Sequence, residues 1–101
     1  MSYSNGVRGF LVECYWPGVS EKQIGARAAR VRAATLERRT QRGRVDFVQS
    51  IAIPDDETVF WLFEGREVDV RAVAGEAGLT FERILESLTI DGTSIQRKEQ
   101  K

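Results

Sequence analysis

Strand-like and helix-like patterns follow one another along the 101 residues in the order strand, helix, strand, strand, helix, strand. Alternating apolar residues predict strands over 8–16, 45–53, 57–63 and 80–90, although 80–83 could form a turn instead. Helical periodicity and strong helix formers predict helices over 20–41 and 66–77. Two right-handed crossovers in this order place both helices on one face of a four-stranded antiparallel sheet. We therefore expect an α+β fold, a ferredoxin-like βαββαβ sandwich.

The first predicted helix has clear signals at both ends. Ser20 and Gln23 have the spacing of a capping box, in which each side chain bonds the backbone amide of the other residue. Gly43 suits a left-handed cap beyond the last turn. Helical spacing predicts one buried stripe, made of Ile24, Ala28, Val31 and Thr35.

The length of the chain suits one domain. We expect this domain over 8–91, after a disordered or extended N-terminus at 1–7 and before a solvated tail at 92–101. The formal net charge is zero, but the charges are unevenly distributed along the chain. Residues 1–53 contain nine basic and four acidic residues, and residues 54–101 contain six basic and eleven acidic residues. This split allows charge-complementary contacts between subunits.

The chain contains no histidine, which removes several chemistries at once. Ser-His-Asp and Cys-His catalysis, histidine metal sites and histidine pH switches are all excluded. A single cysteine, Cys14, cannot form an internal disulfide and fits a reducing compartment. The sequence shows no signal-peptide pattern and no uncharged run near the ~20 residues of a membrane helix. We therefore expect a cytoplasmic protein that does not bind membranes.

The third predicted strand is apolar on both faces, from Val59 to Phe63. The first strand also has large side chains on both faces, with Leu11 and Tyr15 opposite Val12 and Trp16. Helices on one side of a sheet leave the other side bare, and a bare face normally alternates apolar and polar residues. We therefore expect the open sheet face to be covered by a second copy, as in a dimeric α/β barrel. Such a homodimer can enclose a small-molecule ligand in a cleft.

Glu13 is a carboxylate in the middle of an apolar strand and needs a partner there. Arg83, Arg8, Tyr15 or a bound cation could supply it, so Glu13 is either a salt-bridge residue or part of a site. Gln49 on the second strand is either a satisfied edge residue or a ligand contact. Cys14 is interpreted as a small buried hydrophobe, with a reactive or metal-binding thiol as the alternative.

The first helix is rich in arginine, which raises the alternatives of a phosphate-binding surface and a solvated helix face. An RNA-recognition domain shares the predicted element order. Its third strand, however, needs a basic-glycine-aromatic signature. The segment from Glu57 to Gly65 has acidic residues towards both ends and lacks that signature, so nucleic-acid binding is not expected.

Three segments resemble a bacterial domain-of-unknown-function family that includes small nickel-binding proteins with a ferredoxin-like fold. These segments are Phe10–Gly18, Val59–Gly65 and Ala77–Ile84, within about 80 residues of similar order. The resemblance implies a homodimer and, in some members, a bound divalent metal. Glu13, Glu64 and Arg83 match polar positions of the family.

Two departures from the family bear on metal binding. Gln49 precedes Ser50 where members often have histidine, and Trp61 stands where they often have cysteine. Without imidazole donors a borderline-soft metal such as nickel loses its preferred ligands. We therefore expect no bound metal and no cofactor, and we expect that Trp61 fills or reshapes the pocket.

The sequence thus predicts a homodimeric small-molecule binding or accessory module. One alternative is a cofactor-free dimeric α/β-barrel enzyme (monooxygenase, cyclase or isomerase type), with Glu13 as base. Another is a protein-interaction module that uses the bare sheet or the basic helix. Outside that enzyme alternative, the sequence identifies no catalytic residue. The candidate ligand-binding residues are Glu13, Tyr15, Gln49, Trp61, Glu64 and Arg83.

Overall fold

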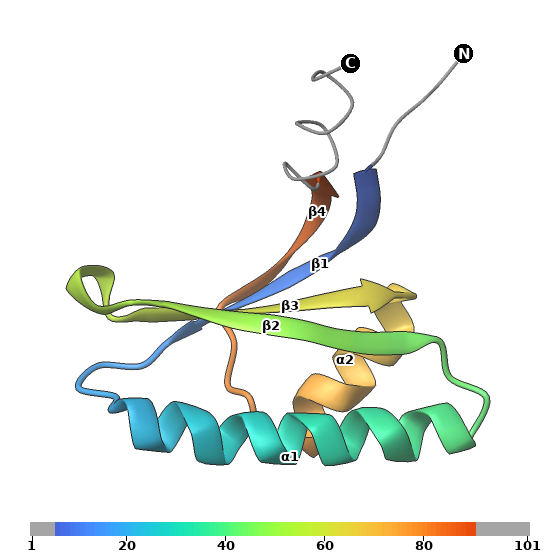
Figure 1. The fold of residues 1–101 in the computed structure, drawn as a ribbon, viewed down its shortest axis with the longest axis horizontal. Coiled ribbons are helices and arrows are strands. Elements are labelled where there is room, and N and C mark those ends of the chain that lie inside the picture. Colours follow the sequence, from blue (N-terminus) through green and yellow to red (C-terminus); the bar gives the residue numbers. More distant parts are fainter. Residues whose placement is uncertain (1–5, 91–101) are drawn as a thin grey trace, which may run out of the picture.

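The computed structural model describes residues 6–90, which form one sheet and one helical layer (Figure 1). The elements are β1 (Gly6–Tyr15), α1 (Glu21–Thr40), β2 (Val45–Ile53), a short 3-10 turn (Pro54–Asp56), β3 (Thr58–Gly65), α2 (Glu67–Glu76) and β4 (Arg83–Ile90). The strands are antiparallel in the order β2-β3-β1-β4, and both helices cover one face of the sheet. This is the predicted ferredoxin-like α+β arrangement.

The predicted boundaries differ from the observed ones mainly at the first and last strands of the chain. β1 begins at Gly6, two residues before the predicted strand start. β4 begins only at Arg83, because residues 80–82 form the connection from α2, as the turn alternative allowed. Most of the predicted N-terminal segment and the whole predicted tail at 92–101 lie outside the described residues.

α1 starts with the predicted capping box. The Gln23 amide donates to Ser20 Oγ at 3.1 Å, and the Ser20 amide donates to Gln23 Oε1 at 2.8 Å. At the other end the predicted role of Gly43 is wrong, because Arg42 adopts the left-handed conformation with φ of 69°. The Gly43 amide then donates to the Arg38 carbonyl at 2.9 Å and closes the last turn.

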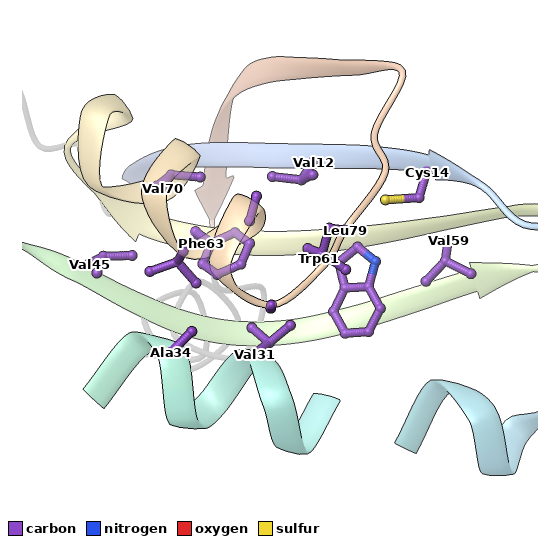
Figure 2. Packing of buried hydrophobic residues seen from close by; sticks show 13 residues of the cluster. Val12, Cys14, Val31, Ala34, Val45, Val59, Trp61, Phe63, Val70 and Leu79 are labelled. Carbon is purple, nitrogen blue, oxygen red and sulfur yellow. The ribbon is translucent and has the colours of Figure 1, made fainter. Parts of the chain in front are cut away.

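The core lies between the sheet and the two helices. Trp61 and Phe63 of β3 are fully buried there, and Val31 of α1 and Val70 of α2 pack against the same layer (Figure 2). The predicted stripe on α1 faces this core, since Val31 and Thr35 are buried and Ile24 and Ala28 are half-buried. β3 lies inside the sheet, where it pairs with two strands, and it also supplies the largest buried side chains.

A β-bulge at Val48 interrupts the pairing of β2 with β3. Before it Phe47 pairs with Phe63, and after it Ser50 pairs with Trp61. The inserted residue reverses which side chains face the helices, since strand side chains alternate. The interpretation of 45–53 as one uninterrupted alternation is therefore wrong, and Gln49 and Ile51 share a face with Leu62 and Phe60 instead of with Phe47.

Gly9 is required by the close approach of β1 to β3. A Cβ atom at this position would lie 2.1 Å from the carbonyl oxygen of Phe63, which is backbone and cannot move aside. The buried glycine thus lets the central pair of strands approach each other at this register.

Asp69 joins the C-terminal end of α1 to the N-terminal end of α2. Its buried carboxylate accepts hydrogen bonds from Arg38 Nε at 2.8 Å, from the Arg44 amide at 2.8 Å and from Arg66 Nε at 2.9 Å. The hydrogen bond from the Arg44 amide, and after it the Arg38 guanidinium, lowers the pKa of Asp69 to about 2, although burial acts in the opposite direction. One carboxylate therefore joins residues 38–44, at the end of α1, to the start of α2, 25 to 31 positions away in the sequence.

We predict that Asp69→Asn lowers the melting temperature by on the order of 10 °C, because arginine donors lose a buried anionic partner. Asp46→Asn is the matched control: its ion pair with Arg39 is exposed on both sides, so a change of a few degrees at most is expected. Equal losses for the two variants, measured by differential scanning calorimetry, would contradict the assigned role.

The lowered pKa also predicts an acid dependence. The stabilisation from Asp69 is complete above its ordinary pKa of 3.8 and is lost as the pH falls towards 2, because the unfolded chain takes up the proton more readily. Between these pH values the melting temperature of the wild type should fall more steeply than that of Asp69→Asn. An equal fall of the melting temperature with pH in the two proteins would contradict this prediction.

Candidate functional site

The sheet face away from the helices is apolar in its centre. Leu11 of β1 lies between Leu62 of β3 and Leu85 of β4, and Phe60 lies beside Ile51 of β2. Ile51 is 44% exposed, Leu11, Phe60 and Leu85 are half-buried, and Leu62 is already buried between its neighbours. We call this surface the open face, defined by Leu11, Ile51, Phe60, Leu62 and Leu85.

Glu13 and Arg83 lie directly opposite each other on β1 and β4 at the edge of the open face. Arg83 Nε donates to Glu13 Oε1, so Arg83 is the partner among the predicted alternatives. The Glu13 carboxylate raises the pKa of Arg83 above its ordinary value. Only 20% of the Glu13 side chain is exposed, against 64% for Arg83. The pair is a partly buried carboxylate covered by a solvated guanidinium.

Tyr15 also lies on this face, two residues beyond Glu13, and its side chain reaches the β2–β3 turn. Its hydroxyl donates to Glu57 Oε1 at 3.0 Å. This hydrogen bond and the negative charge of Glu57 raise the pKa of Tyr15 above its ordinary value. The sequence does not distinguish Glu57 from the two acidic residues before it, because three adjacent acidic residues in a turn usually indicate a solvated segment.

Gln49 and Glu64 also belong to the open face but lie further from the ion pair. Gln49 is exposed and lies opposite Leu62, just after the bulge. Glu64 is half-buried and lies opposite Gly9, four positions along β1 from Glu13. The structure thus distributes the predicted polar residues around an apolar centre and brings only Glu13 and Arg83 into direct contact.

Trp61 does not line this face, which corrects the sequence-based assignment. It pairs with Val12, and neighbouring residues of a strand point to opposite faces, so Trp61 is directed into the core. Its ring lies 5.8 Å from that of Phe47, and its Nε1 is buried. Trp61 is a core residue.

Cys14 faces the same core as Trp61 (Figure 2). It lies beside a separate cavity of about 250 Å³, lined also by Arg27 and Leu79. Burial raises the pKa of the thiol to about 11, although the Trp61 indole and Arg27 act in the opposite direction. Within residues 6–90, no three or more cysteine, aspartate or glutamate side chains are grouped so that they could hold a metal ion. The described donor set therefore does not fit the nickel that the family resemblance implies.

Comparison with known proteins supports the fold alone. No family model matches the chain, and no curated protein matches it. The crystal structure of SCO4226 from Streptomyces coelicolor A3(2) is similar, with a TM-score of 0.65 and 23% identity over 75% of this chain and 90% of that one. In the described part of this chain, no helix has the length and hydrophobicity needed to span a bilayer.

We predict that Cys14 is unreactive in the folded protein. A pKa of about 11 instead of 9.0 lowers the thiolate fraction at pH 8 by about a hundredfold, and burial restricts access further. Iodoacetamide labelling followed by mass spectrometry should therefore be at least about a hundredfold slower in buffer than in guanidinium chloride. Equal labelling rates would contradict the assignment of Cys14 as a core residue.

Proposed function

We propose that this protein is a cytoplasmic homodimeric binding or accessory module, in which two open faces pack against each other and enclose a site for a small molecule. The observation that carries the proposal is the apolar centre of the open face, with side chains from all four strands. Burying one side chain of the size of leucine or phenylalanine contributes about 1.5–3 kcal/mol. Pairing of two copies would recover the part of that contribution that the exposed Ile51 and the half-buried Leu11, Phe60 and Leu85 still lack.

A two-fold axis would bring the same surface from both copies together. Each copy would then contribute the Glu13–Arg83 pair at the margin of the shared apolar centre. Their carboxylate and guanidinium offer an acceptor and several donors, while Leu11 and Phe60 offer contact for an apolar body. This combination favours a ligand that has an apolar body and a polar group at one end.

The enzyme alternative assigns the role of a base to Glu13. One oxygen of this carboxylate already accepts a hydrogen bond from Arg83. This contact therefore supports binding or positioning more than proton abstraction.

Light scattering at micromolar concentration should give twice the monomer mass for the wild type. Ile51→Glu should give the monomer mass, because it places a charge in the apolar centre of the open face. Leu36→Glu is the matched control: Leu36 is also exposed, but it lies on α1 in the helical layer, so this variant should remain dimeric. A monomeric wild type would refute the dimer.

Native mass spectrometry of the purified protein should show a bound small molecule, and Glu13→Gln should reduce its occupancy by about tenfold through loss of a charged contact. Glu86→Gln is the control, because Glu86 lies opposite Phe10 and so faces the helix side of the same sheet. If Glu13→Gln changes only thermal stability and not occupancy, Glu13 is a structural ion-pair residue.

A further inference from the structure

A second hollow lies away from the centre of the open face, between the start of α1 and the β2–β3 turn. Its volume is about 470 Å³, within the range of ligand cavities, and its walls come from the β1–α1 connection, α1 and the hairpin. Figure 1 shows that the hairpin and the β1–α1 connection lie at the same end of the molecule. We call it the hairpin pocket, defined by Trp16, Val19, Ile24, Ala52 and Glu57.

The floor of the hairpin pocket is apolar and continuous with the core. Trp16, Val19 and Ile24 are half-buried and pack against the buried cluster. They can therefore offer rigid contact to an apolar or aromatic body. The core on one side and the hairpin on the other limit the size of that body to a small molecule.

Glu57 is held in place at the margin of this floor. Its backbone is left-handed, with φ of 54°, which is uncommon for a residue other than glycine. Its carbonyl accepts a hydrogen bond from the Trp16 amide at 2.7 Å, and its Oε1 accepts one from the Tyr15 hydroxyl. The bond from the Trp16 amide joins two walls of the pocket, and the bond from Tyr15 fixes the carboxylate from outside it. No described residue donates to Glu57 Oε2.

The ionisable side chains that line the hairpin pocket are both carboxylates, Glu21 and Glu57. Arg27 lies over the ring of the lining residue Trp16, at 5.1 Å from its centroid, but donates to the Gly78 carbonyl beside the other cavity. Arg27 does not line the hairpin pocket. The two side-chain charges of the pocket therefore repel an anionic ligand and attract a cation.

We propose that the hairpin pocket binds a small apolar or aromatic molecule that carries a protonated amine. The apolar body lies on Trp16, Val19 and Ile24, and the ammonium group donates to Glu57, with Glu21 adding negative charge. This site is independent of the proposed dimer, because its floor faces the helical layer and not the centre of the open face.

The test is an NMR titration of the 15N-labelled protein with 2-phenylethylamine, 3-phenylpropan-1-ol and 3-phenylpropanoate, three probes that share the aromatic body and differ in charge. We expect saturable shifts at residues 16–24 and 52–58 with the amine at millimolar concentration. The alcohol should bind more weakly, and the carboxylate at least about tenfold more weakly than the amine.

Variants separate the charge from the shape of the pocket. Glu57→Gln keeps the acceptor for Tyr15 and should weaken the amine about tenfold while leaving the alcohol unchanged. Ala52→Phe should fill the hollow and abolish binding of both. Glu86→Gln, on the same sheet but outside the pocket, should bind the amine like the wild type.

Three results would overturn the proposal: no saturable shift with the amine, equal affinity for the carboxylate, or shifts confined to the open face. An amine affinity unchanged in both Glu57→Gln and Glu21→Gln would overturn it as well. Light scattering on the same samples reports the oligomeric state separately, so failure of the hairpin pocket and failure of the dimer are distinguishable.

Discussion

The central strand β3 has large apolar side chains on both faces, and this places two burial requirements on the fold. Trp61 and Phe63 point to the helical layer and are fully buried there. Phe60 and Leu62 point the other way, to the open face, where Leu62 is already buried by its neighbours but Phe60 is only half-buried. The helices therefore satisfy one requirement, and the proposed dimer satisfies the other. The position of β3 between two neighbouring strands makes both requirements unavoidable, since every side chain of a strand must face one side of the sheet or the other.

The helical layer in turn depends on polar contacts at its end. Packing of Val31 and Val70 onto the sheet is non-directional and does not by itself set where α1 ends relative to α2. The three hydrogen bonds to Asp69 supply that direction, because they require the ends of both helices and the start of β2 to meet at one carboxylate. Apolar packing thus provides the stability of the layer, and one buried ion cluster provides its register.

The two proposed sites differ in how far the sequence could predict them. Glu13 stands out in the sequence because a carboxylate interrupts an apolar strand, and Arg83 was among its predicted partners. The hairpin pocket has no such signal. Its residues come from three separate segments, and Glu57 is inconspicuous beside Asp55 and Asp56 until the turn gives it a left-handed backbone.

By itself the sequence determined the order of the elements, the capping box of α1 and the apolar character of both faces of β3. These depend on local periodicity and on side chains a few residues apart. Only the tertiary structure decided that Trp61 belongs to the core, that the bulge at Val48 brings Gln49 to the open face, and that Asp69 joins both helices. Each of these depends on strand register or on contacts between distant segments. A shift of one residue exchanges the two faces of a strand, so local patterns alone do not specify them.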